Sequence, residues 1–212
     1  MVFSATLIII IITVAVSLYA NSNPELHSKL MFNPYQVVHR KEWYRIFTHA
    51  FIHDQNNIFH LFFNMYVLYS FGNAAESILL NQMGALGILY YLLIYIGGIA
   101  IATLPAIIKH KDNYSYNSVG ASGAVSAVLF STIAFVPFSG GIGIMFIPNF
   151  SIPPLVFGVL YLAYEMYMQK RGGTNIAHDA HIWGAIFGFL FTLLFVPGAF
   201  SNFMMQLISL VN

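Results

Sequence analysis

The sequence predicts an all-α membrane protein with six transmembrane helices and a long, partly embedded first loop. Of its 212 residues, 58% are hydrophobic and only 7% are charged, against about 25% charged in ordinary soluble domains. Several uncharged stretches exceed the roughly 20 residues that a helix needs to cross the hydrocarbon core. Because lipid offers no partners for unpaired backbone groups, each stretch is expected to be helical.

Polar and Pro/Gly-rich segments divide the apolar sequence into discrete stretches. The expected spans are residues 2–20, 57–77, 83–107, 118–136, 152–169 and 178–196. The first has no Lys or Arg ahead of its apolar run, so we expect a retained span and no secretory signal. Residues 1–196 then form one domain, and the tail 197–212 is too short for another span and is expected at the membrane interface.

Charge and cysteine content exclude several functions. The formal net charge is +1, which gives no argument for nucleic acid binding. The chain has no cysteine, which excludes disulfides, thiolate metal sites and thiol nucleophiles. We expect no cofactor and no metal, and the oligomeric state stays open.

The first loop, residues 21–56, is long for so small a protein. It carries several aromatic residues and half of the cations, which are Lys29, Arg40, Lys41 and Arg45. One interpretation is an interfacial segment with an aromatic belt and snorkelling cations. The other is a half-embedded structure that braces an active site.

His60 and Asn64 are the first candidate pair within a span. They are four residues apart, so they share one face of a helix. An ionisable residue inside a span is a functional candidate that faces the bundle interior or a water cavity. The structural alternative is an interhelical hydrogen-bond pair.

Ser122 lies between Gly120 and Gly123, ahead of an apolar stretch. The glycines permit unusual backbone angles and a close approach of substrate. A serine at a helix N-terminus also lies beside free backbone N–H groups, which suit a developing oxyanion. The structural alternative is an N-cap serine in a small-residue helix contact.

His181 precedes Gly184 and Gly188, a small-residue face that permits close helix packing. Such packing could bring His181 to Ser122, and a serine hydroxyl needs a base to become a good nucleophile. Asp179 is a possible third member. Two residues apart on a helix, it would point away from His181, so a dyad is favoured.

These motifs together resemble the signatures of the rhomboid family of intramembrane serine proteases. They are His60-x-x-x-Asn64, Gly120-x-Ser122-Gly123 and Ala180-His181-x-x-Gly184-x-x-x-Gly188, in the family's order on the second, fourth and sixth expected spans. Trp43 and Arg45 resemble an element of the family's first loop, His49 and His53 match the histidines that follow it, and Gly72 and Glu76 match positions near the end of the second span. The resemblance covers about residues 40–190.

The resemblance implies a bundle of six helices with a water-filled cavity that opens to one face. Ser122 would be the nucleophile and His181 the general base and then acid, with His60, Asn64 and the Ser122 backbone N–H as the oxyanion hole. Structural support would come from Gly120, Gly123, Gly184, Gly188, Trp43, Arg45 and Glu76. The substrates would be transmembrane segments of other proteins.

Two features depart from the family pattern. Many members carry an aromatic residue four positions after the serine, stacked on the histidine, where this chain has Ser126. This leaves open how His181 is held. The spacing from His53 to His60 is also longer than usual, which could alter the entry to the oxyanion helix.

Two other classes of function compete with a serine protease. His49 with His53, and His178 with His181, have spacings that metal ligands on helices can have, which would suit a metal-dependent membrane enzyme. The second class is a non-enzymatic channel, transporter or membrane chaperone, including an inactive relative that serves as a binding scaffold.

Orientation is predicted differently by two arguments. With six spans, all eight Lys and Arg residues lie in loops opposite the termini, and the positive-inside rule puts those loops in the cytoplasm. The resemblance puts the first loop and the active-site opening outside. Following the resemblance, we expect a multi-pass protein of the plasma (inner) membrane with an outward-opening site.

Overall fold

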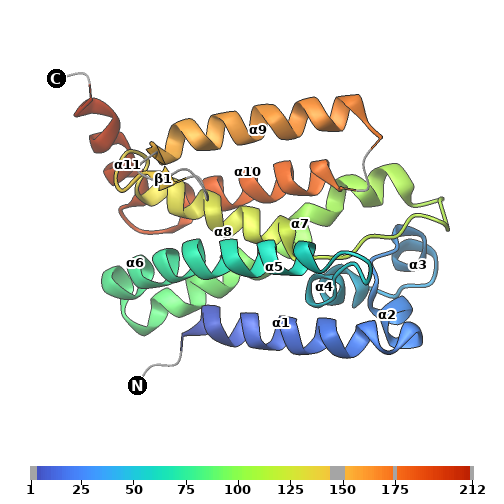
Figure 1. Ribbon diagram of the computed structural model, residues 1–212. Helices are drawn as coiled ribbons and strands as arrows, with labels where there is room; N and C mark the ends of the chain where they lie inside the picture. Colours follow the sequence, from blue (N-terminus) through green and yellow to red (C-terminus); the bar gives the residue numbers. More distant parts are fainter. Residues whose placement is uncertain (1–3, 144–150, 174–175, 211–212) are drawn as a thin grey trace.

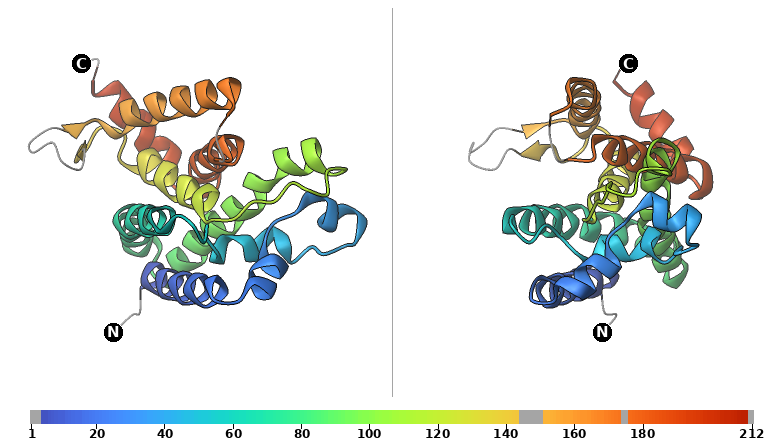
Figure 2. Two further views of the ribbon diagram at one scale, coloured as in Figure 1. Left: turned by 45° about the vertical axis from the view of Figure 1, so that its right-hand side comes forward. Right: turned by 90° about the vertical axis from the view of Figure 1, so that its right-hand side faces the viewer.

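The computed structural model describes residues 4–143, 151–173 and 176–210, and this part of the chain is mostly helical (Figure 1). The helices are α1 (Ala5–Asn21), α2 (Pro24–Leu30), α3 (Pro34–His39), α4 (Arg45–Thr48), α5 (Ile58–Val67), α6 (Asn73–Met83), α7 (Ala85–His110), α8 (Ser122–Phe135), α9 (Pro154–Arg171), α10 (His178–Phe195) and α11 (Ala199–Ile208). A 3-10 turn, η1 (His49–Phe51), follows α4, and a π-helical turn, η2 (Leu68–Gly72), joins α5 and α6 into one rod. Two short antiparallel strands, β1 (Ile142–Gly143) and β2 (Ser151–Ile152), project beside α9 (Figure 2).

Each predicted span lies on a helix or on the continuous rod of α5, η2 and α6. Among the described residues, α7 and α10 are long and apolar enough to cross a membrane by length and composition. The apolar helices α1 and α8 are shorter, with 17 and 14 residues. The fourth span was predicted to begin at residue 118, but the helix begins at Ser122 because Ser118 pairs with Phe32 in an extended bridge.

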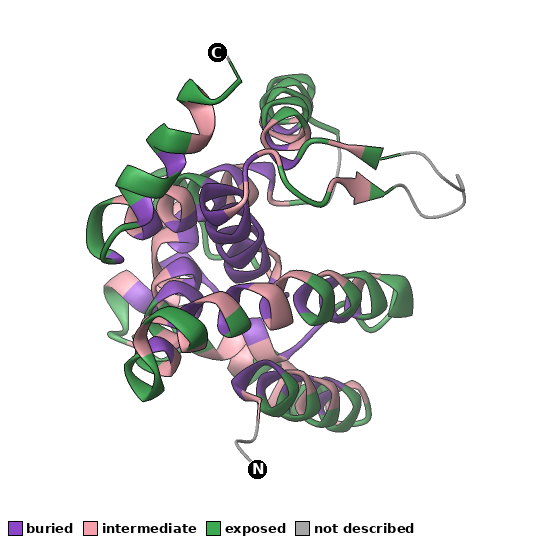
Figure 3. Cartoon of the chain, turned by 90° about the vertical axis from the view of Figure 1, so that its left-hand side faces the viewer, coloured by how far each residue is buried: buried purple, intermediate pink, exposed green. Residues whose placement is uncertain are grey.

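Helix α8 forms the centre of the bundle and is buried along nearly its whole length (Figure 3). It packs against α7 and α10, and three of its polar side chains have hydrogen-bond partners on neighbouring elements. Ser126 bonds Tyr161 of α9 at 2.9 Å, Ser131 accepts a 2.7 Å bond from Thr192 of α10, and Thr132 bonds the Phe71 carbonyl at 3.2 Å. These hydrogen bonds offset the cost of burying the hydroxyls and link α8 to α9, α10 and η2.

Glycine lets the backbones of α8 and α10 meet. A Cβ at Gly184 would lie 2.1 Å from the carbonyl oxygen of Gly123, and one at Gly188 would lie 1.9 Å from that of Ala127. Atoms cannot approach so closely, so no side chain fits at either position. This contact confirms the close packing that the small-residue spacing predicted. It also fixes the position of α10 along α8.

Glu76 of α6 accepts the hydrogen bonds that join α6 to the start of α1. Its buried carboxylate accepts hydrogen bonds from the backbone N–H groups of Ala5 and Thr6 at 2.7 and 2.9 Å, and from the Ser4 hydroxyl at 2.8 Å. The first N–H groups of a helix have no partner within the helix, and their positive end favours an anion. A residue predicted as structural support therefore caps a neighbouring helix.

Arg45 holds the first loop together. Its guanidinium is buried and donates to the carbonyl oxygens of Ser28 and Met31 at 2.9 and 2.8 Å, and to the Glu42 carboxylate. The bond from Arg45 lowers the pKa of Glu42 below its usual value. Trp43, the other residue of this loop predicted as structural support, is 54% exposed, and such a ring suits the lipid–water interface.

The tail beyond α10 forms α11, an amphipathic helix that lies against the bundle. Phe203 is buried and contacts Phe189 edge-to-face, and the Gln206 amide donates to the Phe135 carbonyl at 3.0 Å. The predicted interfacial position of this tail stays a prediction. The start of α1 and the end of α11 lie at one end of the bundle, opposite the first loop (Figure 1).

Candidate active site

One large cavity brings the predicted site residues together. It has a volume of about 1050 Å³ and opens between α5, α8, α9 and α10. Its lining includes Ser122, His181, His60, Asn64 and Glu165. The first four were named from sequence motifs on three different helices, and they face the same space.

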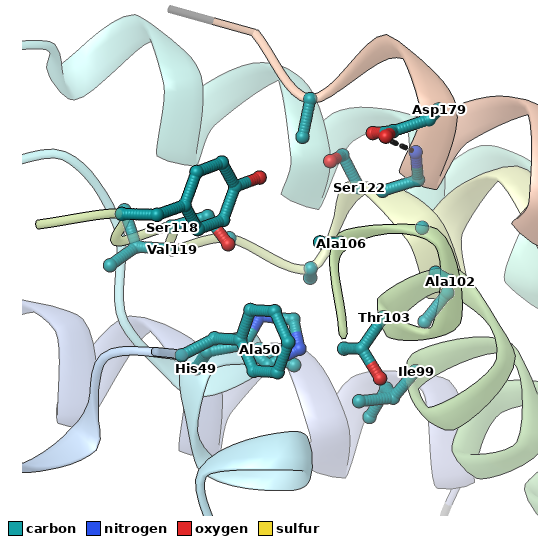
Figure 4. Close-up of a pocket in the computed structure, with 18 residues that line it drawn as sticks. His49, Ala50, Ile99, Ala102, Thr103, Ala106, Ser118, Val119, Ser122 and Asp179 are labelled. Atoms are coloured by element: carbon teal, nitrogen blue, oxygen red, sulfur yellow. Dashed lines mark hydrogen bonds between the residues drawn. The ribbon is translucent and has the colours of Figure 1, made fainter. Parts of the chain in front are cut away.

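Ser122 is the first residue of α8, at the end of the loop that crosses the bundle. A second pocket of about 30 Å³ lies on its other side, between α7, α8 and the first loop (Figure 4). Ser122 lines both cavities. As the first residue of the helix, it lies beside backbone N–H groups that have no partner within the helix.

Gly120 shapes the approach to the serine. Its φ of +115° suits glycine alone, and a Cβ there would lie 2.7 Å from Cε1 of His60. Its N–H also donates to the carbonyl of His49 at 3.0 Å. The His60 ring therefore packs directly on the loop that precedes Ser122, which places one expected oxyanion donor near the expected nucleophile.

His60 and Asn64 lie one turn apart on α5, as predicted. Asn64 is 7% exposed, and its amide donates one hydrogen bond to the His60 carbonyl at 2.8 Å. An Asn amide has two N–H donors, so one remains for a ligand. The His60 ring contacts the buried His53 ring edge-to-face at 5.1 Å, and His53 Nδ1 lies 2.9 Å from Ser17 Oγ.

His181 lies in the first turn of α10, beside the start of α8. The Ala180 carbonyl would lie 3.4 Å from a Cβ at Gly123, the residue after the serine. In the described part of the chain, the side chains of Ser122 and His181 face one cavity without a direct hydrogen bond. Catalytic hydrogen bonds are commonly long before substrate arrives.

Glu165 of α9 also belongs to this site, although no sequence motif pointed to it. Its carboxylate is 4% exposed, with Oε1 3.0 Å from Nδ1 of His181 and Oε2 hydrogen-bonded to Nδ1 of His178. A signal was present, because Glu165 is the one acidic residue between Asp112 and Asp179. A lone carboxyl within a predicted span marks a functional candidate.

Asp179 and Ser126 also have new partners. Asp179 Oδ2 accepts a 3.0 Å bond from Lys109, and its Oδ1 accepts from the Ala180 N–H. This carboxylate therefore links α10 to α7 and accepts a bond from a backbone N–H of its own helix. Ser126, which replaces the aromatic residue of the family pattern, hydrogen-bonds to Tyr161. An aromatic side chain thus reaches this position from α9.

The cluster of Glu165, His178 and His181 is also the one group of three possible metal ligands among the described residues. One ligand atom from each lies within 4.8 Å of the others. Two imidazoles and a carboxylate form a donor set that Zn²⁺ accepts. The same atoms already bond one another directly, which satisfies the carboxylate without an ion. The other histidine pair, His49 and His53, gains no third ligand in the described residues.

Curated relatives place the chain in a wider context. It is 29% identical over 133 residues to the mitochondrial presenilin-associated rhomboid-like protein of Bos taurus, and 28% identical over 133 residues to that of Homo sapiens. The match to form A of Danio rerio is 28% over 133 residues. Each covers 62% of this chain but 33% of the relative, so the chain spans about a third of these proteins.

These relatives correct one prediction. The plasma (inner) membrane was expected, but the relatives are mitochondrial proteins by name, and that expectation was wrong. The expected location had been taken from the family resemblance, because the hydrophobicity of a span does not distinguish one membrane from another.

A family model confirms the resemblance. The Rhomboid domain matches residues 40–198, which is three quarters of the 212 residues and includes every motif residue from Trp43 to Gly188. The match takes in residues 40–56 of the first loop and ends just beyond α10, so the matched region holds the cavity lining except His27 and Met31. The chain belongs to the rhomboid family.

Proposed function

We propose that this protein is an intramembrane serine protease that hydrolyses peptide bonds in or near transmembrane segments of other membrane proteins. The observation that carries the proposal is the shared cavity, lined by Ser122, His181, His60 and Asn64. A nucleophile, a base and two hydrogen-bond donors around one space are the parts that acyl transfer needs.

The first half of the reaction forms an acyl-enzyme. His181 takes the proton of the Ser122 hydroxyl while Oγ bonds to the carbonyl carbon of the substrate. The carbonyl oxygen becomes an oxyanion, held by the Ser122 backbone N–H, His60 and Asn64. When this intermediate collapses, the C–N bond breaks and the amine leaves with the proton from His181.

The second half releases the product. A water molecule enters the cavity, gives a proton to His181 and attacks the ester carbonyl. The ester bond to Oγ then breaks, and Ser122 recovers its proton from His181. A water-accessible cavity serves this step, since hydrolysis inside a bilayer depends on water that lipid does not supply.

The proposed architecture is one catalytic domain of six spans, residues 1–196, with α11 beyond it. The spans are α1, the rod of α5, η2 and α6, then α7, α8, α9 and α10. Helices α5, α8 and α10 carry His60, Ser122 and His181 in or before their second turns, so their N-terminal ends converge on the cavity. The positive ends of these helices favour the oxyanion.

Labelling with a fluorophosphonate probe tests the proposal. The purified protein should react covalently, and Ser122→Ala and His181→Ala should each abolish labelling while retaining the wild-type melting temperature. Ser118→Ala, which removes a hydroxyl from the same cavity lining, is the matched control and should label normally. Labelling that survives in Ser122→Ala would overturn the assignment.

A metal-dependent enzyme is the second candidate, favoured by the grouping of Glu165, His178 and His181. The two candidates differ in their response to chelators. A serine protease keeps its activity in excess EDTA and loses it to serine-acylating inhibitors, whereas a metal enzyme does the reverse.

A further inference from the structure

Glu165 joins two histidines through both of its oxygen atoms. Oε1 lies 3.0 Å from Nδ1 of His181, and Oε2 is hydrogen-bonded to Nδ1 of His178. Glu165 and His178 are each 4% exposed. A buried carboxylate is costly unless it is paired and hydrogen-bonded, so these contacts explain how α9 tolerates an acid.

The atoms involved determine the state of His181. When Nδ1 carries the hydrogen and donates it to Glu165, Nε2 keeps its lone pair and is the atom that accepts a proton. The bond also fixes the orientation of the ring. As His181 takes the proton of Ser122, the adjacent carboxylate stabilises the imidazolium.

His178 anchors the carboxylate from the other side. It lies one turn before His181 on α10, and the two rings meet at 78° with centroids 6.2 Å apart. Because each oxygen of Glu165 has its own imidazole, the carboxylate cannot rotate without losing a bond. His178 thereby positions Glu165, and Glu165 positions His181.

Other groups near His181 do not supply this contact. Asp179 is committed to Lys109 and the Ala180 N–H. Tyr161 of α9 bonds Ser126, and His60 of α5 lines the same cavity, whereas the described contact of His181 Nδ1 is with Glu165. Ser126 cannot stack on the imidazole, so a different element must hold the ring.

We propose that Glu165 is the positioning residue of His181, so that Ser122, His181 and Glu165 work as a triad whose third member comes from α9. This inference rests on the proposed protease function. It assigns to a carboxylate the orienting task for which the family pattern offers an aromatic ring.

The test compares acid-to-amide variants at two sites, with cleavage of a transmembrane substrate as readout. Glu165→Gln keeps the size of the side chain but presents an N–H₂ to one imidazole, and it should lower kcat on the order of 10²–10⁴-fold with KM unchanged. Asp179→Asn is the matched control and should keep wild-type kcat. Glu165→Asp, which retains the carboxylate, should recover part of the loss.

The outcomes separate this inference from the proposed function. If wild type cleaves and Glu165→Gln matches Asp179→Asn in kcat, the positioning role is wrong and the protease assignment stands. If wild type neither cleaves nor labels at Ser122, the protease assignment itself fails. If Glu165→Gln does not fold, Glu165→Asp is measured in its place. A wild-type kcat with a raised KM in Glu165→Asp would show that Glu165 does not position His181. Activity lost in EDTA and restored by Zn²⁺ would make Glu165 a metal ligand instead.

Discussion

The carbonyl oxygen of Ala127 faces Gly188 so closely that a Cβ on Gly188 would lie 1.9 Å from it. The contact joins α8, which begins at Ser122, to α10, which carries His181. The distance between Ser122 and His181, the proposed nucleophile and base, therefore depends on backbone packing one to two turns away from either residue.

Gly188→Ala should separate α8 from α10. A methyl group cannot occupy that space, and about 1 Å of misplacement can cost roughly 10²-fold in rate. We expect a lower melting temperature and a kcat reduced by about that factor. The matched control is Gly158→Ala on α9, where the added Cβ meets the movable end of Ile133 at 3.1 Å. Wild-type kcat and stability in Gly188→Ala would contradict the packing argument.

Asn64→Ala should weaken the transition state more than substrate binding. Loss of one oxyanion donor typically lowers kcat by about 10²–10³-fold. Steady-state kinetics should give a reduced kcat with KM nearly constant, and the melting temperature should confirm that α5 is intact. A raised KM with unchanged kcat would make Asn64 a substrate contact.

Glu76→Gln should loosen α1 and leave the chemistry intact. The neutral amide loses the charge that suits a helix N-terminus and offers one acceptor oxygen in place of two, for a loss of about 1–3 kcal/mol. The expected result is a lower melting temperature with normal kcat below the transition. Glu25→Gln, at an exposed acid of α2, is the control. Equal melting temperatures for both variants would remove Glu76 as a structural support.

Acid should destabilise the first loop through His53. Burial, with smaller effects of His60 and His49, lowers the pKa of His53 to about 3, whereas an unfolded histidine titrates near 6.5. Below about pH 6.5 the unfolded chain therefore binds a proton that the folded chain refuses. Stability is complete above that pH and falls as the pH drops toward 3, by at most about 1.4 kcal/mol per pH unit for one group.

Melting temperatures measured from pH 7.5 to 4.5 check this dependence. His53→Gln should make the curve shallower, because one titrating group is gone, while His49, whose pKa burial lowers to about 4, still contributes. His110→Gln, at a histidine stacked on Tyr116 elsewhere, should keep the wild-type slope. A His53→Gln protein with an unchanged slope would assign the acid sensitivity to other groups.

The sequence predicted those features that depend on spacing along one helix. Gly184 and Gly188 indicated a close contact because small residues one turn apart form a continuous face, and the structure confirms it. His60 and Asn64 share a face for the same reason. Signals for short helices were also present in the first loop, since Asn23 and Asn33 each cap a helix whose first residue is proline.

Features that depend on which helices are neighbours could not be derived. Nothing in the order of residues says that α9 packs beside the start of α10, so the partnership of Glu165 with His181 was out of reach. The same holds for Tyr161 and Ser126, which meet across 35 residues. The sequence left the position of Trp43 open, because an aromatic residue in an apolar chain is compatible with either core or interface.

The most direct test of the account is cleavage of a model transmembrane substrate by the purified protein in liposomes. Wild type should cut the substrate in EDTA, and Ser122→Ala should leave it intact while keeping the wild-type melting temperature. Ser118→Ala should cut as wild type does. Cleavage by folded Ser122→Ala, or an uncut substrate with wild type under conditions where a serine probe does not label it, would contradict the assignment of Ser122 as nucleophile.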